Sequence, residues 1–219
     1  MQVPFGWAVV LGCFGVSVGA GVALGSPALL YTLLFSAVLG TAYSVDLPLL
    51  RWKRNALLAS MCILIIRALV VQIGFYSHIR QSVPQLDMPP WTESRATVFG
   101  VGFMTVFSIV IAFFKDIPDV DGDRRNNVQS LSVRLGTDTV FRICIGMLLA
   151  LYTGAALFAL GGNNGGGSYL ACAAHFALAG LTVAKARAVD LAKAASIWSS
   201  YMFIWKLFYL EYCLLPLMG

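Results

Sequence analysis

Four carboxylates stand within eight residues of this chain, in the segment FFKDIPDVDGDRR that follows a long apolar stretch. At about 100° per residue, a helix would bring Asp116, Asp119 and Asp123 within roughly 60° of one another and place Asp121 on another face. Converging carboxylates repel one another and favour a cation, and hard oxygen ligands select Mg²⁺ or Ca²⁺. Mg²⁺ also binds phosphate oxygens, so the segment predicts a magnesium site for a phosphorylated ligand. The alternative is a solvated acidic loop.

A basic group follows an earlier apolar stretch, in AYSVDLPLLRWKRN. Arg51 and Arg54 can each bind phosphate oxygens in a bidentate manner, and Lys53 adds a point charge. Taken alone, such a run is more typical of a topology anchor that also touches anionic lipid. Combined with an acidic metal site above an apolar bundle, it matches a ligand with a diphosphate head and a long hydrocarbon tail.

Three further residues are candidates for lining a substrate cavity. Arg67 lies near the middle of an apolar stretch, where a charge is costly and should face the protein interior. It either lines a cavity or pairs with a buried acid such as Glu211. Tyr43 and Ser44 could contact the diphosphate or an aromatic acceptor, although Tyr is also common at membrane interfaces. We assign no catalytic role to the two histidines.

The amino-acid composition of the chain indicates what kind of structure must position these residues. Of 219 residues, 59% are hydrophobic and only 11% are charged, less than half the usual charge of a soluble domain. Such a chain cannot cover a globule with a solvated surface, which excludes a soluble enzyme, a disordered tail and a nucleic-acid-binding domain. The five cysteines are odd in number and lie in apolar stretches, so we expect them to be buried and inert.

The expected fold class is therefore all-α, a polytopic transmembrane helical bundle, because hydrocarbon offers the backbone no water to bind. Stretches of about 20 apolar residues identify membrane spans. We predict seven: 3–24, 27–47, 56–78, 96–114, 140–160, 169–188 and 197–217. The glycines of the first span are spaced as in closely packed helix pairs. The loop GGNNGGGS at 161–168 is predicted to be a flexible linker.

Basic residues orient these spans. The loops after the second, fourth and sixth spans, with one residue just inside the fifth, hold eleven of the fifteen Lys and Arg residues: Arg51, Lys53, Arg54, Lys115, Arg124, Arg125, Arg134, Arg142, Lys185, Arg187 and Lys193. The opposite loops hold only Arg80 and Arg95. By the positive-inside rule the first set faces the cytoplasm, stroma or matrix, which we call the inner side.

DIPDVDGD, placed on an inner loop after a span, resembles the second aspartate-rich motif of the UbiA superfamily of membrane-embedded aromatic prenyltransferases. The blocks GTAYSVDLPLLRWKRNA, RALVVQIGFY, IAFFKDIPDVDGDR, QSLSVRLG and YMFIWKLFYLEYCLLP extend the resemblance from about residue 40 to the C-terminus. They are most similar to the branch of the family that prenylates homogentisate in the plastid tocopherol pathway.

This resemblance implies Mg²⁺-dependent transfer of a phytyl or geranylgeranyl group from its diphosphate to homogentisate. Asp116, Asp119 and Asp123 would bind Mg²⁺ and the diphosphate. Arg51, Lys53 and Arg54 would contact the diphosphate, with Lys115 and Arg124 as weaker candidates. The implied partners are the two small-molecule substrates and the lipid bilayer, with no nucleic acid. The implied location is a plastid membrane, with the active-site loops facing the stroma.

The family normally has nine spans and a first Asn/Asp-rich motif, whereas this chain has seven predicted spans and lacks that motif. We therefore expect residues 1–219 to form a single membrane-embedded prenyltransferase domain that is incomplete at its N-terminus. Two alternatives stay open at this point. One is a prenyltransferase for another acceptor, such as a naphthoate or a chlorophyllide. The other is a non-catalytic protein: a shortened relative that binds prenyl lipid or a partner, or a small transporter.

The charge asymmetry predicts that loops 51–55, 115–136 and 185–196 share the inner side of the membrane. Single cysteines at positions 124 and 163, placed in a background without native cysteines, should react with an impermeant thiol reagent from opposite sides. Labelling of both positions from the same side would contradict this topology.

Overall fold

The computed structural model describes residues 3–125, 129–162 and 165–219; parts of the loops at 115–136 and 161–168 thus lie outside the described residues. It divides into two compact units, residues 1–97 and 98–219. The described residues form helices and connecting loops and include no strand. Seven helices in this part of the chain are long and apolar enough to cross a membrane, which confirms the predicted all-α class and the seven spans. The prediction of one prenyltransferase domain stays a prediction.

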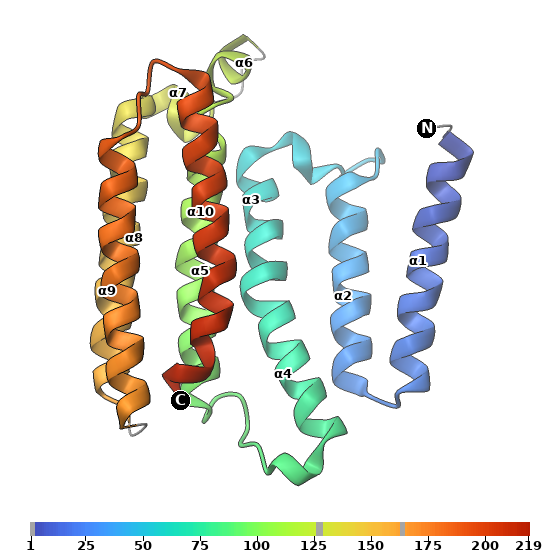
Figure 1. Ribbon diagram of the computed structural model, residues 1–219. Helices are drawn as coiled ribbons and strands as arrows, with labels where there is room; N and C mark the ends of the chain where they lie inside the picture. Colours follow the sequence, from blue (N-terminus) through green and yellow to red (C-terminus); the bar gives the residue numbers. More distant parts are fainter. Residues whose placement is uncertain (1–2, 126–128, 163–164) are drawn as a thin grey trace. The chain divides into compact units, whose positions relative to one another are not determined.

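The first unit contains three spans (Figure 1). Helix α1 (Val3–Ala23) turns at Gly25, whose φ of 58° suits a residue without a side chain, into α2 (Pro27–Ser44). Ser26 caps α2 by accepting a hydrogen bond from the Leu29 amide, and Pro27 occupies the first turn. The 3₁₀ turn η1 (Trp52–Arg54) follows. These signals explain why α1 and α2 form a tight antiparallel hairpin.

The third span of this unit is continuous but irregular. It comprises α3 (Ala56–Leu64), the π-helical turn η2 (Ile65–Val70) and α4 (Val71–Ser82), and it ends before the 3₁₀ turn η3 (Pro84–Leu86). Helix α4 approaches α2 closely at Gly74, because a Cβ atom there would lie 1.9 Å from the Thr32 Oγ1 atom. Of the glycines predicted to pack in α1, Gly21 contacts Leu30, whereas Gly15 and Gly19 have no described neighbour within reach.

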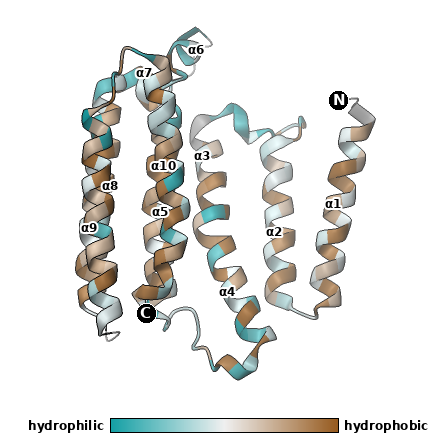
Figure 2. Cartoon of the chain, in the orientation of Figure 1, coloured by the Kyte–Doolittle hydropathy of each residue, from teal (hydrophilic) through white to brown (hydrophobic). Residues whose placement is uncertain are grey.

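The second unit contains four spans: α5 (Arg95–Lys115), α8 (Thr137–Leu160), α9 (Gly166–Arg187) and α10 (Ala194–Leu214). Two short helices, α6 (Val120–Arg125) and α7 (Leu131–Leu135), join α5 to α8, and the 3₁₀ turn η4 (Leu215–Met218) follows α10. On α5, Phe103, Phe107, Val110 and Phe114 are buried at helical spacing along one face. Figure 2 shows apolar residues dominating the spans and polar ones gathering at α6.

A buried polar pair crosses this apolar core. His175 of α9 and Glu211 of α10 are both fully buried, and the distance from Nε2 to Oε1 is 3.0 Å. The Ala171 carbonyl can only accept a hydrogen bond, so Nδ1 donates to it, at 2.6 Å. The pair then holds one proton between Nε2 and the carboxyl group, and Phe103 and Tyr152 enclose the imidazole ring. We infer that the pair sets the register of α9 against α10.

Glu211→Leu should destabilise the protein, because it leaves the buried imidazole without its partner. Coupling between membrane-buried polar side chains is modest, so we expect a coupling free energy of about 1 kcal/mol between the two positions. Thermal unfolding of Glu211→Leu, His175→Leu and the double variant in detergent would measure it. Glu211→Gln should be milder, since its amide can still donate to Nε2.

The expectation of buried cysteines is wrong for Cys13 and Cys213, which are exposed. Cys213→Ser on α10 therefore serves as the control for these unfolding measurements and should leave the unfolding temperature unchanged. Strictly additive effects of Glu211→Leu and His175→Leu would show that the pair contributes no interaction energy.

Candidate functional site

The acidic segment is a turn followed by a short helix, so the single helix assumed from the spacing is wrong. Helix α5 ends at Lys115, residues 116–119 form a turn, and α6 begins at Val120. Pro118 has no amide hydrogen to continue the helical pattern, and the buried Ile117 anchors the turn to the second unit. Helical geometry resumes at Asp119, whose carbonyl accepts from the Asp123 amide at 2.8 Å.

The charges of the three candidate carboxylates nevertheless act on one another. The Asp116 side chain is only 17% exposed, and its Oδ1 atom lies 3.5 Å from Lys115 Nζ. Burial raises the pKa of Asp116 above its ordinary value; the Lys115 ammonium lowers it, and the negative charges of Asp123 and Asp119 raise it further. Asp121 is exposed and is not among the groups that shift this pKa. The negative charges of Asp119 and Asp123 thus act on Asp116, and the assignment of the three carboxylates to one metal site stays a prediction.

These carboxylates fit a cation that shares its ligands with a substrate. Among the residues that the structure describes, no three His, Cys, Asp or Glu side chains are placed so that they could hold a metal ion by themselves. Mg²⁺, however, takes one or two protein carboxylates and completes its shell with water and phosphate oxygens. The raised pKa of Asp116 reports the burial and like-charge repulsion that a divalent cation would relieve. The donor set is thus suited to Mg²⁺ that arrives with a diphosphate.

One acidic residue orders the basic loop of the first unit, although the sequence alone predicted no role for it. Asp46 forms ion pairs with Arg51 and, at 3.8 Å, with Arg54. Leu49 and Arg51 adopt left-handed backbone conformations, with φ of 67° and 59°. The Trp52 indole donates to the Leu49 carbonyl at 2.8 Å and closes the turn. The five-residue spacing between Asp46 and Arg51 was the signal that could have revealed this pairing.

Two other inner-side acids are likewise engaged. Asp138 pairs with Arg142 one helical turn later, and Asp190 pairs with Lys193 at 2.9 Å. The Lys193 ammonium and the Ala192 amide hold the pKa of Asp190 below its usual value. Asp46, Asp138 and Asp190 therefore have basic partners, as Asp116 has in Lys115, but Asp116 also feels the negative charges of Asp119 and Asp123.

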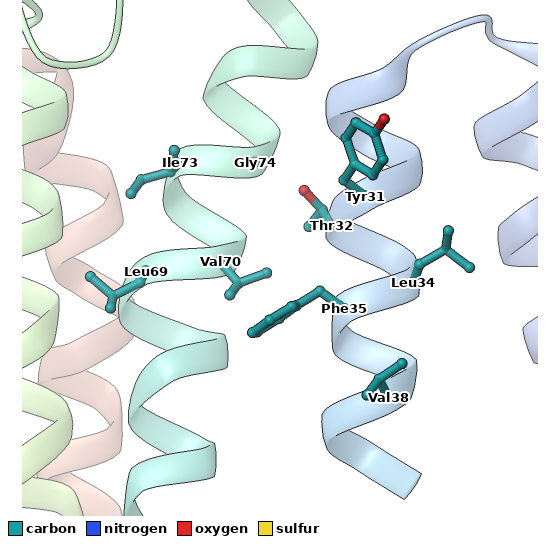
Figure 3. Close-up of a pocket in the computed structure, with 9 residues that line it drawn as sticks. All are labelled: Tyr31, Thr32, Leu34, Phe35, Val38, Leu69, Val70, Ile73 and Gly74. Atoms are coloured by element: carbon teal, nitrogen blue, oxygen red, sulfur yellow. The ribbon is translucent and has the colours of Figure 1, made fainter. Parts of the chain in front are cut away.

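The three residues predicted to line a substrate cavity do not all line the same cavity. Tyr43 and Arg67 line one cavity of about 270 Å³ along α2, α3 and η2, whereas Ser44, the last residue of α2, is not in its lining. A larger cavity of about 560 Å³ lies between α2 and α4; Figure 3 shows its lining, which includes Phe35, Leu69 and Ile73 and no charged side chain. Glu211, the alternative partner considered for Arg67, is bound by His175 in the second unit.

The candidate residues fall into two sets. Asp116, Asp119, Asp123, Lys115 and Arg124 belong to the second unit, where Arg124 is exposed on α6. Arg51, Lys53, Arg54, Tyr43, Ser44 and Arg67 belong to the first. Within each unit the structure brings together the groups described above. The roles assigned to these residues stay predictions.

Comparison with known proteins finds relatives that are all named as transferases of a prenyl group. The chain is 45% identical over 215 residues to homogentisate phytyltransferase 1, chloroplastic, of Arabidopsis thaliana, covering 98% of this chain and 54% of that protein. It is 44% identical over 215 residues to homogentisate geranylgeranyltransferase of Hordeum vulgare, covering 98% and 52%. It is 39% identical over 215 residues to coumarin 8-geranyltransferase 1, chloroplastic, of Citrus limon, also covering 98% and 52%.

The chain thus spans about half the length of these relatives. No solved structure matches it. The sequence model of a family described as "UbiA prenyltransferase family" matches residues 1–207. This range includes every candidate site residue named above. The match covers nearly all of the chain and agrees with the seven apolar spans and the acidic segment at the end of one of them. The chain therefore belongs to the UbiA prenyltransferase family.

Proposed function

We propose that this polypeptide carries the diphosphate-binding part of an enzyme that transfers a phytyl or geranylgeranyl group from its diphosphate to homogentisate. The observation that carries the proposal is the acidic segment at the end of an apolar span, where the negative charges of Asp119 and Asp123 act on the largely buried Asp116. Homogentisate as acceptor is supported by the 44–45% identity to homogentisate prenyltransferases, against 39% to the coumarin enzyme. The proposed location is a plastid membrane with the acidic segment facing the stroma, because two of these relatives are named chloroplastic.

Asp116, Asp119 and Asp123 would hold Mg²⁺ against the diphosphate. Bound Mg²⁺ would neutralise the charge that develops on the departing diphosphate. Arg51, Lys53 and Arg54 would add positive charge to the same leaving group; this role rests on the sequence, which predicts their loop to be on the same side of the membrane. Lys115, already 3.5 Å from Asp116, would stay close to the bound anion, and Arg124 would add charge from α6.

In the proposed reaction the allylic C–O bond breaks and its electron pair leaves with the diphosphate. The aromatic ring then supplies the electron pair of the new C–C bond and releases the proton from the ring carbon that is attacked. The acceptor loses its carboxylate as carbon dioxide, and a proton takes its place on the side-chain carbon. Apolar spans are suited to this step because they exclude water that would otherwise capture the prenyl cation. Transfer to a neutral phenolic acceptor is the runner-up, and it would be recognised by turnover with a coumarin and none with homogentisate.

The acidic segment predicts unequal effects of four matched substitutions. In a polypeptide that includes the upstream region, Asp116→Asn, Asp119→Asn and Asp123→Asn should each lower turnover by about 100-fold or more, because each removes charge that holds the cation. Asp121→Asn is the matched control and should change turnover little. Prenyl transfer in isolated membranes at saturating Mg²⁺ measures the effect. Equal losses at all four positions would show that Asp121 belongs to the site; no loss at Asp116 and Asp123 would exclude the metal site.

We predict that residues 1–219 alone have low prenyltransferase turnover, because few of their carboxylates are available to bind divalent ions. A diphosphate carries about three negative charges and is usually neutralised by more than one divalent ion together with basic side chains. The acidic segment can support one Mg²⁺ well, while Asp46, Asp138 and Asp190 are engaged by basic partners. Membranes with this chain, or with a version extended upstream, would be supplied with phytyl diphosphate, homogentisate and Mg²⁺. Comparable product from both would refute the charge argument.

A further inference from the structure

One acidic side chain of the first unit binds two arginines of the loop that follows α2. Between residues 45 and 55 the chain has three basic residues, Arg51, Lys53 and Arg54, and one acidic residue, Asp46. The Asp46 Oδ2 atom pairs with Arg51 Nη1, and its Oδ1 atom lies 3.8 Å from Arg54 Nη2. Both guanidinium groups therefore converge on one anionic group, and this group belongs to the chain itself.

These ion pairs are accessible to water and to ligands. The side chains of Asp46 and Arg54 are 66% and 69% exposed, and that of Arg51 is 31% exposed. Ion pairs with this exposure contribute little free energy. The contacts with Asp46 use Nη1 of Arg51 and Nη2 of Arg54, whereas a phosphate group can bind two nitrogens of one guanidinium group. A phosphate-bearing ligand can therefore compete with Asp46 for both arginines.

The charges of the loop match a multiply charged anion better than a single carboxylate. Three positive charges and one negative charge stand between residues 45 and 55. Lys53 is exposed and forms no ion pair in the described part of the chain. A diphosphate carries about three negative charges. The three basic residues would therefore balance a bound diphosphate once the Asp46 carboxylate no longer occupies two of them.

The backbone between Asp46 and Trp52 is suited to a change of conformation. Leu49 and Arg51 have φ of 67° and 59°, a left-handed region that residues other than glycine rarely adopt. Two contacts close this turn: Asp46 pairs with Arg51, and the Trp52 indole donates to the Leu49 carbonyl at 2.8 Å. The Leu49 side chain is exposed, so packing within the chain does not stabilise its backbone. Release of Arg51 from Asp46 would remove one of the two contacts that hold the turn.

We propose that Asp46 occupies the guanidinium groups of Arg51 and Arg54 in the ligand-free protein and is displaced when a diphosphate binds. The inference rests on the proposed function, in which these arginines and Lys53 bind the diphosphate. Asp46 acts through the two arginines and does not itself contact the ligand. Its competition lowers the affinity for every anion by the same factor, so weakly binding anions with a single charge leave the arginines to Asp46. A multiply charged diphosphate gains more from the three basic residues and displaces the carboxylate.

Equilibrium binding of inorganic pyrophosphate tests the proposal without requiring prenyl transfer. Radiolabelled pyrophosphate would be bound, with and without Mg²⁺, to the detergent-solubilised, upstream-extended polypeptide. Asp46→Asn removes the competing charge and should bind pyrophosphate about two- to fivefold more tightly, the range expected for exposed ion pairs. Asp46→Ser, a second neutral variant, should show the same gain. Asp46→Glu keeps the charge and should retain the affinity of the unaltered protein.

Three comparisons separate competition from a general effect of charge. Asp138→Asn removes another exposed acid that is paired with an arginine, Arg142, and should leave the affinity for pyrophosphate unchanged. In Arg51→Gln, Asp46 has lost its closest partner, so the addition of Asp46→Asn should raise the affinity less than it does in the unaltered protein. The gain in Asp46→Asn should also become smaller at high salt, because exposed charges are screened.

The inference is overturned if Asp46→Asn binds pyrophosphate no more tightly than the unaltered protein, or if Asp138→Asn gives the same gain. A loss of affinity confined to samples with Mg²⁺ would make Asp46 a metal ligand and would overturn it as well. If phosphatidylglycerol in the micelles reduced pyrophosphate binding by the unaltered protein, the arginines would belong to a lipid headgroup, which also contradicts the proposal. Failure of the proposed function has a different signature: the effect of Asp46 on pyrophosphate binding persists, but no prenyl group passes to homogentisate.

Discussion

The structure depends on one constraint: inside a bilayer, neither a peptide group nor a charged side chain can be hydrated. This constraint makes the spans helical and moves nearly all charges to their ends. Of the ten acidic residues, Glu211 alone lies in a span beyond its first turn, and there it pairs with His175. Arg67 obeys the same constraint in another way, because it sits beside a cavity at an irregular turn.

Near the ends of the helices, the acidic residues differ in how they are paired. Asp46, Asp138 and Asp190 each have a basic partner nearby in the sequence, and such pairs stabilise a loop or a helix end locally. The acidic segment has one close ammonium, that of Lys115, for several carboxylates. In the proposed function, a cation bound together with an anionic ligand would relieve the repulsion that acts on Asp116.

The two cavities of the first unit differ in the chemistry that they can accommodate. The larger one, lined by α2 and α4, has an apolar lining and no formal charge (Figure 3). The smaller one combines a guanidinium with hydroxyl groups. A lipid chain gains by leaving water at any apolar surface, so the larger cavity has little selectivity.

The sequence by itself determined the helical class and the seven spans within a few residues at each end. Hydrophobic length and the desolvation of the backbone leave no other solution in a bilayer. It also identified the acidic segment, because four carboxylates in eight residues need no distant contact to be recognised. Tertiary structure alone decided the rest. The turn at Asp116–Asp119 interrupts the assumed helix, since the burial of Ile117 and the missing amide hydrogen of Pro118 outweigh the helical spacing. The pairing of His175 with Glu211, 36 residues apart, and the cavity shared by Tyr43 and Arg67 arise where helices pack side by side. Such contacts depend on how helices are rotated against their neighbours, and periodicity along one helix carries no information about that rotation.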